Sequence, residues 1–134
     1  TQGVSSAASD VYKRQMYKPY HLIGLELGIS VASVGLRREP TGAPAGWHGD
    51  VVATAKRDLQ AGQLLDGEGG YTVYGRLMPA RDSVEEGYLP LGLSHQVKLK
   101  HAVRQSQAIR WSDVEYDDRS QAVQFRREME QTFA

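Results

Sequence analysis

The chain has 134 residues, in which 16 lysines and arginines balance 16 aspartates and glutamates, and it contains no cysteine. A net charge of zero argues against a nucleic-acid binder or a membrane-surface binder, because both need an excess of basic residues. The absence of cysteine excludes a disulfide scaffold, a cysteine zinc site and a cysteine nucleophile. The length allows one domain, or one domain with an appended segment. The longest apolar stretch, 22–36, is too short to span a membrane.

The first 15 residues, TQGVSSAASDVYKRQ, are small and polar and show no apolar period. The string SSAASDVYKRQ within them resembles translated sequencing-adaptor read-through. We therefore expect residues 1–15 to be a non-native, disordered segment that does not belong to the fold. On this interpretation the genuine sequence begins near Met16, in the middle of a longer protein.

A helix is predicted for residues 19–36, PYHLIGLELGISVASVGL, within the segment 16–36. Pro19 suits the first helical position, and Gly35 suits a C-terminal stop. Apolar residues surround most of the circumference, which is typical of a helix that is buried on several sides. Because so short a chain can hardly enclose such a helix, we expect it to belong to a preceding catalytic domain.

Two ionisable residues, His21 and Glu26, interrupt this apolar helix. Buried ionisable groups are unfavourable unless they are paired, and for that reason they often mark functional sites. Both are therefore the candidate catalytic residues, with structural polar groups near a helix end as the alternative. A second alternative treats this segment as a signal peptide, against which Glu26 argues because acidic residues oppose membrane insertion.

The rest of the chain up to Tyr116 is predicted to be a linker followed by short strands. Residues 37–50 are rich in glycine and proline and carry no period, as expected of a linker. Residues 51–116 contain the β-prone runs 51–55, 71–74 and 97–100. The last run alternates apolar residues with lysines, which predicts one apolar and one basic face.

An internal repeat lies within this strand region. A shift of 44 positions superposes AKRDLQAGQLL, residues 55–65, on LKHAVRQSQAI, residues 99–109. The matched pairs are Lys56 with Lys100, Leu59 with Val103, Gln63 with Gln107, and Leu65 with Ile109. Each copy is predicted to be a strand, a tight turn and a strand. Gly62 suits a positive φ in the first turn, whereas Ser106 adopts that conformation less readily if the second turn is kept.

Residues 117–134 are predicted to form an amphipathic C-terminal helix with Asp117, Asp118 and Ser120 as candidate caps. The apolar positions that we expect to pack are Ala122, Phe125, Met129 and Phe133. The positions that we expect to be solvated are Arg126, Arg127, Glu128 and Glu130.

Motifs for catalysis, metal binding and phosphate binding are absent from the sequence. The four histidines lack metal-ligand spacing, and neither a P-loop nor a G-x-S-x-G elbow occurs. GEGG at 67–70 predicts a hairpin turn, and Glu85-Glu86 reads as a pair of solvated loop charges. Between Gly87 and Ser112 the chain carries basic residues and no acidic one. We interpret this stretch as an exposed strand that lysines protect from edge pairing, with an acidic or phosphorylated partner as the alternative.

The string RDLQAGQLLDGEGGYTVYG, followed by LPLGLSHQVKLK and WSDVEYD, resembles an SAF domain. This small β-clip module is shared by flagellar P-ring chaperones, sialic acid synthases, antifreeze-like domains and sugar-acid dehydratases, and a twofold repeat is expected of it. The resemblance implies a mainly β fold class. It places an SAF-type β-clip domain at 51–116, flanked by a buried N-terminal helix and an amphipathic C-terminal helix.

PYHLIGLE at 19–26, joined to AKRDLQAGQLLDGEGGY at 55–71, resembles the C-terminal part of one enzyme family. Its members are NAD(P)-dependent oxidoreductases similar to homoserine dehydrogenase, including a deoxyxylulose-phosphate reductoisomerase-like branch. The resemblance covers Met16 to the C-terminus and implies a cytoplasmic enzyme that transfers hydride between nicotinamide and a small carbonyl or hydroxy substrate. The family's Rossmann domain, catalytic lysine and carboxylates have no counterpart in this sequence.

NAD or NADP is therefore implied only for a longer parent, and no cofactor is expected in this chain. The implied partners are an N-terminal Rossmann and catalytic domain, the parent's small-molecule substrate, and further subunits of a homo-oligomer; neither nucleic acid nor a membrane is expected. The rival interpretation is a stand-alone SAF binding module, such as an exported flagellar-assembly-type chaperone whose signal peptide is 16–34. A module of a sugar-acid dehydratase is a third interpretation, but it leaves the PYHLIGLE helix without a counterpart.

Overall fold

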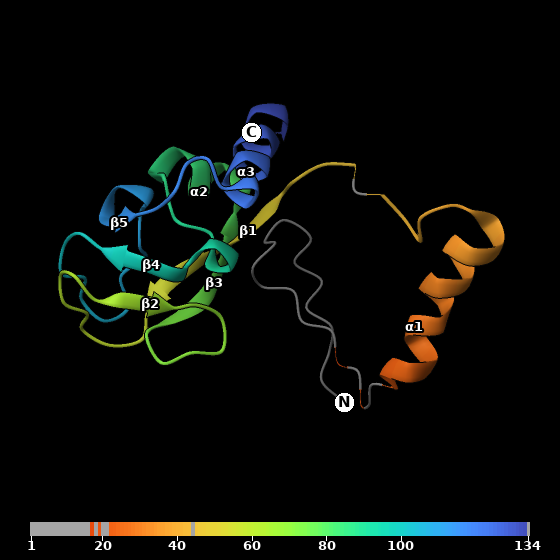
Figure 1. Ribbon diagram of the computed structural model, residues 1–134, viewed down its shortest axis with the longest axis horizontal. Coiled ribbons are helices and arrows are strands. Elements are labelled where there is room, and N and C mark those ends of the chain that lie inside the picture. Colours follow the sequence, from red (N-terminus) through yellow and green to blue (C-terminus); the bar gives the residue numbers. More distant parts are fainter. Residues whose placement is uncertain (1–16, 18, 20–21, 44, 134) are drawn as a thin grey trace. The chain divides into compact units, whose positions relative to one another are not determined.

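The computed structural model describes residues 17, 19, 22–43 and 45–133, and the chain divides into two compact units, Thr1–Gly46 and Trp47–Ala134 (Figure 1). The predictions for residues 1–15 and for His21 therefore lie outside the described residues. No helix in the described part of the chain is long and apolar enough to cross a membrane.

The first unit contains α1 (Ile23–Ala32), which continues into a π-helical turn at Ser33–Arg37. This helix begins later than Pro19 and passes through Gly35, so the predicted start and stop are wrong. It ends at Arg38, whose left-handed backbone (φ 57°) turns the chain away from the helical path.

The predicted N-terminal helix is exposed in this chain, and its burial against a preceding catalytic domain stays a prediction. No residue of α1 is buried, and Leu25 and Ile29 are 74% and 67% exposed. An apolar circumference shows that a helix can be buried, but a neighbouring surface is needed to bury it.

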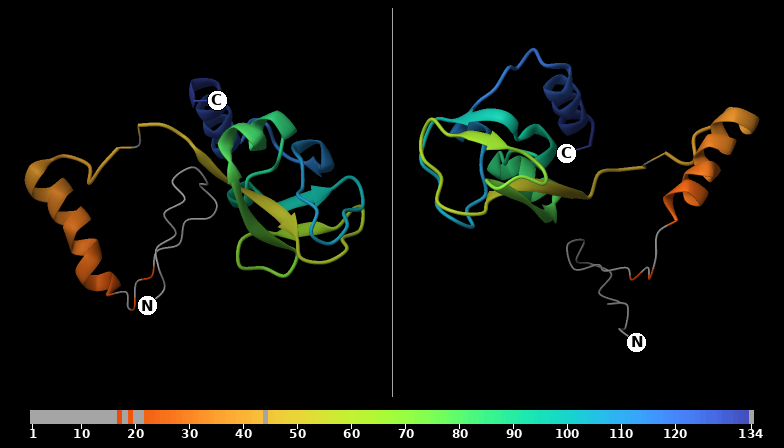
Figure 2. Two further views of the ribbon diagram at one scale, coloured as in Figure 1. Left: turned by 180° about the vertical axis from the view of Figure 1, so that it is seen from behind. Right: turned by 60° about the horizontal axis from the view of Figure 1, so that its bottom comes forward.

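The second unit contains two small antiparallel sheets and two α-helices among its described residues (Figure 2). One sheet pairs β1 (Gly49–Ala55) with β3 (Val73–Pro79). The other has the order β2 (Leu64–Asp66), β4 (His95–Leu99), β5 (Val114–Glu115). The helices are α2 (Ala80–Glu86) and α3 (Gln121–Phe133).

The predicted strands are confirmed in part. The run 51–55 lies in β1, whereas 71–74 enters β3 only at Val73. The run 97–100 lies in β4 up to Leu99, with Leu99 buried and Lys98 exposed, as the alternation predicts. The predicted linker ends too late, because β1 already begins at Gly49.

The internal repeat is confirmed by hydrogen bonds that recur at the same shift of 44 positions. Leu59 and Val103 exchange backbone N–H···O bonds of 2.8 and 3.0 Å. The Gly62 N–H donates to Leu99 O (2.7 Å), and the equivalent bond in the other copy runs from Ser106 N–H to Ala55 O (2.8 Å). The Leu99 N–H donates to Gln63 O (2.9 Å), and its equivalent runs from Ala55 N–H to Gln107 O (2.9 Å). Each copy therefore holds the other in a pseudo-twofold arrangement centred on Leu59 and Val103. The second turn keeps the first turn's geometry, since φ is +80° at Gly62 and +66° at Ser106.

The core of the second unit lies around this repeat. The buried apolar side chains that form it are Ala53, Ala55, Leu59, Leu65, Val73, Leu89, Leu99, Val103, Ile109, Trp111, Val114 and Val123. Because helical segments hold more of the described residues than strands do, the mainly β class is not supported. The described residues instead combine two small antiparallel sheets with three α-helices.

The helices of the second unit differ from expectation in two ways. α2 is not predicted at all, because seven residues are too few for a readable period, and Glu85 and Glu86 lie at its end instead of in a loop. In α3 the buried residues are Val123 and Arg126, whereas Phe125 and Phe133 are 62% and 47% exposed. The predicted packing and solvated faces of this helix are therefore largely exchanged.

Candidate functional site

The two sequence-predicted site residues are not brought to a site in the described residues. His21 lies outside them, and Glu26 is half-buried on α1 in the first unit. Two candidate sites lie in the described part of the second unit, a buried ionic cluster and a polar pocket.

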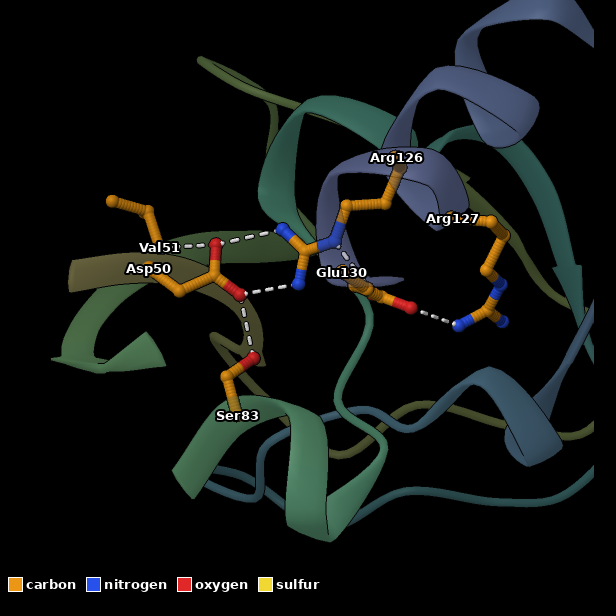
Figure 3. A network of polar contacts seen from close by, with 6 residues as sticks. All are labelled: Asp50, Val51, Ser83, Arg126, Arg127 and Glu130. Carbon is orange, nitrogen blue, oxygen red and sulfur yellow. Dashed lines mark hydrogen bonds and ion pairs between the residues drawn. The ribbon is translucent and has the colours of Figure 1, made fainter. Parts of the chain in front are cut away.

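The ionic cluster centres on Asp50 of β1, which is 7% exposed (Figure 3). Its Oδ1 and Oδ2 accept hydrogen bonds from Arg126 Nη1 (3.0 Å) and Nη2 (2.6 Å) of α3. Oδ2 also accepts the Ser83 hydroxyl of α2 at 2.6 Å, and Oδ1 accepts the Val51 N–H at 2.9 Å. One carboxylate thus joins β1, α2 and α3, since a bidentate guanidinium fork fixes both distance and orientation.

A second carboxylate of the cluster, Glu130, lies on α3 beside the arginines. Glu130 accepts Arg126 Nε at 2.7 Å and Arg127 Nη1 at 2.8 Å. The two guanidinium carbons lie 4.5 Å and 4.3 Å from the ring centroids of Trp47 and Trp111, respectively. Such stacking stabilises a cation that has lost part of its water.

The cluster keeps its groups ionised. Burial raises the pKa of Asp50, but the hydrogen bonds from Arg126 and Ser83 outweigh that effect and lower it below 3.8. Burial lowers the pKa of Arg126, but the hydrogen bonds to Asp50 and Glu130 outweigh that effect and raise it above the ordinary value. Because both Asp50 oxygens are already engaged by neighbouring groups, we interpret the cluster as a structural clamp and not as a catalytic site.

The polar pocket has a volume of about 430 Å³, which lies within the roughly 300–1,000 Å³ typical of small-molecule sites. It is lined by Arg76 of β3, Tyr88 after α2, the second repeat turn, and the segment that leads to β5. The lining residues are Arg76, Tyr88, Ala102, Val103, Ser106, Gln107, Ala108, Arg110 and Asp113.

The Arg110 side chain contacts two neighbouring residues at the pocket. It forms an ion pair with Glu86 and lies over the Tyr88 ring, 5.5 Å from the centroid. The hydrogen bond to Glu86 raises its pKa above the ordinary value, so it is always a cation. Its backbone N–H donates to Asp113 Oδ2 at 2.9 Å, which places a carboxylate at the pocket edge.

Strand register places the pocket on one face of β1. Thr54 lies opposite Tyr74 and Ala108, Val52 lies opposite Arg76, and Tyr88 lies opposite Arg110. Directly opposed residues of antiparallel strands, and residues two apart on one strand, point to the same face. The buried Thr54 hydroxyl therefore lies on the same face as the Arg76 and Arg110 side chains, and it has no hydrogen-bond partner among the described residues.

The sequence contains a signal for two residues of this pocket. Ser106 departs from the glycine that the repeat favours, and Arg110 belongs to the stretch without acidic residues. Arg76 and Tyr88 give no such signal, because strand pairing brings them to the pocket, and Asp113 reaches it through the short helical turn that follows Arg110. No group of three or more histidines and carboxylates suited to a metal ion occurs in residues 22–43 and 45–133.

No protein-family model matches the chain, and no curated protein matches its sequence.

Proposed function

We propose that the chain is the C-terminal portion of an NAD(P)-dependent oxidoreductase that resembles homoserine dehydrogenase, with an SAF-type β-clip domain as its second unit. The observation that carries the proposal is the reciprocal bonding of the two repeat copies around Leu59 and Val103. The same residues, 55–65, form part of the string that resembles this enzyme family.

The exposed apolar helix α1 supports the same proposal. An exposed helix whose circumference is mostly apolar is unfavourable in water, so it favours a further domain as its neighbour. In the parent enzyme this portion would supply packing, an oligomer contact or a lid. His21 and Glu26 would be its candidates for reaching the substrate.

The cofactor would be held elsewhere in the parent. The described residues contain no glycine-rich dinucleotide-binding loop between a strand and a helix. They therefore do not fit NAD or NADP, and no step of hydride transfer is assigned to them. The parent would act in the cytoplasm on a small carbonyl or hydroxy substrate.

The upstream DNA tests the proposal directly. We expect an open reading frame that continues through position 16 into a strand followed by G-x-G-x-x-G. Its full-length product should oxidise NADPH with a small carbonyl substrate, whereas the 134-residue chain should not bind NADPH. Micromolar NADPH affinity of the 134-residue chain, or a stop codon directly before Met16, would contradict the proposal.

A stand-alone SAF binding module is the second candidate function. It is favoured by the position of the polar pocket, all of whose lining residues belong to the second unit. Sequencing the mature N-terminus of the expressed protein separates the two functions. Cleavage near residues 33–35 would support an exported module and contradict the enzyme portion.

A further inference from the structure

We propose that the polar pocket of the second unit is a binding site for a small hydroxy-monocarboxylate. The inference does not depend on the proposed function, because the pocket is formed within Trp47–Ala134 alone.

Its lining offers one guanidinium without an ion pair in the described part of the chain, that of Arg76, to a monoanion. Arg76 and Arg110 contribute two guanidinium groups, while Asp113 contributes one carboxylate to the same lining. Arg110 is already paired with Glu86, whereas Arg76 has no ion pair among the described residues. A guanidinium fork binds a carboxylate bidentately, and the Asp113 carboxylate would repel a phosphate dianion more strongly than a carboxylate monoanion.

Its neutral polar groups match hydroxyls. The Gln107 side-chain oxygen accepts the Arg104 N–H at 2.9 Å, which holds the amide in place and leaves its NH₂ group available to donate. Ser106 adds an exposed hydroxyl from the same turn. These groups can hydrogen-bond to a hydroxylated ligand whose carboxylate lies on Arg76.

The two repeat copies differ at the positions that form the pocket. The scaffold positions keep their character, as Leu59 with Val103 and Gln63 with Gln107 show. The pocket positions do not: at the 44-residue shift Gly62 corresponds to Ser106, Leu64 to Ala108, and Asp66 to Arg110. In the second copy the turn therefore carries a hydroxyl, a large side chain is replaced by a small one, and an anion is replaced by a cation. Both copies share the same backbone hydrogen bonds, but at these positions only the second copy carries residues suited to an anion.

The test is an NMR titration of the full 134-residue chain with three matched probes: D-glycerate, glycerol and glycerol 3-phosphate. We expect saturable shifts of the Ser106, Gln107 and Arg110 amides with D-glycerate, no saturable shift with glycerol, and weaker binding of glycerol 3-phosphate. Absence of a saturable shift with D-glycerate would overturn the proposal, and tighter binding of glycerol 3-phosphate would overturn its assignment to a monocarboxylate.

Two variants identify the site. Arg76→Ala should weaken D-glycerate binding at least tenfold, while Arg57→Ala, an exposed arginine outside the lining, should leave it unchanged. The dispersed spectrum of each variant reports directly whether it is folded. Equal affinity in the two folded variants would show that the pocket is not where the probe binds.

Discussion

Arg126 carries a charged side chain that is almost completely buried. A buried guanidinium is unfavourable unless it has a partner. The Arg126 side chain is 8% exposed, and so is that of Asp50, with which it pairs. A buried ion pair contributes little net stability over an apolar pair, but removing one member leaves an uncompensated charge. The importance of Arg126 therefore lies in the carboxylate that it neutralises.

Arg126→Met should destabilise the chain by about 3–5 kcal/mol, because it leaves Asp50 buried with only Ser83 and Val51 as donors. The measurement is the free energy of unfolding from urea denaturation. Arg119→Met is the control, since its partner Asp117 is exposed and the pair should contribute less than about 1 kcal/mol. A loss below that level in Arg126→Met would mean that the clamp does not hold α3.

Asp66 makes stability depend on acid pH. Desolvation raises its pKa, but hydrogen bonds from the Thr72 hydroxyl and from the Tyr71 and Thr72 N–H groups outweigh that effect and lower it to about 2. Because the folded pKa lies below the ordinary 3.8, ionised Asp66 contributes stability that is complete above that pH. This contribution is lost as the pH falls toward about 2.

Asp66→Asn should therefore be less stable than the native chain near neutral pH, and the difference should shrink between pH values of about 4 and 2. Urea midpoints measured across this range for both proteins give the difference directly. The titration of Asp50 is common to both proteins and cancels in the comparison. A difference that is constant with pH would show that the Asp66 carboxylate is not selectively stabilised in the fold.

At the scale of elements, the two repeat turns have the same backbone geometry but different residues at the position of positive φ. Comparing them therefore measures the cost of backbone strain. Gly62 and Ser106 have nearly the same positive φ, which glycine adopts freely and serine does not. A Cβ at Gly62 would come no closer than 3.9 Å to its nearest neighbour, Lys98, so the turn itself has room for a side chain.

Ser106→Gly should stabilise the chain by about 1 kcal/mol, and Gly62→Ser should destabilise it by a similar amount. Both values come from urea denaturation of the single variants. If Ser106→Gly were neutral or destabilising, the serine hydroxyl would be contributing to stability and the strain argument would fail.

The face that α3 turns toward the core differs from the one that its apolar residues predict. Its apolar residues predict a buried Phe125, yet the helix turns Val123 and Arg126 inward because Arg126 reaches Asp50, which is 76 positions away in the chain. Val123→Ala should therefore destabilise the chain by about 1–3 kcal/mol, whereas Phe125→Ala should change stability by less than about 0.5 kcal/mol. Thermal unfolding of the two variants distinguishes this orientation from the one that the apolar pattern predicts, which requires the opposite order.

At the scale of the whole molecule, the second unit has a core of its own. Every residue of the buried cluster lies between Ala53 and Val123, and no residue of α1 is buried. Removing residues 1–46 should therefore leave the cooperative unfolding of Trp47–Ala134 intact, with a midpoint within a few degrees of the full chain's. Circular dichroism during heating measures both proteins, and a truncated chain without a cooperative transition would contradict the assignment of two units.

The sequence predicted what depends on neighbouring residues. The run at 51–55 is β-prone, the run at 97–100 alternates, and the repeat is visible as matched pairs 44 positions apart. The hairpin predicted at GEGG is wrong, because β2 and β3 on its two sides belong to different sheets. The two repeat segments indeed pair with each other. α2 was beyond prediction because its two turns carry too short a pattern.

The tertiary structure decided which surfaces are buried and which polar groups meet. Hydrophobic patterning predicts only what a segment would gain from burial, so it places α1 in a core and Phe125 against one. The partners determine the outcome: Asp50, Ser83 and Arg126 come from three elements, and Arg76 meets the second repeat turn only through the pairing of β1 with β3. Long-range hydrogen bonds and ion pairs leave no periodic trace in a chain. That is why the sequence indicated the repeated scaffold, while the clamp and the pocket became visible only in the fold.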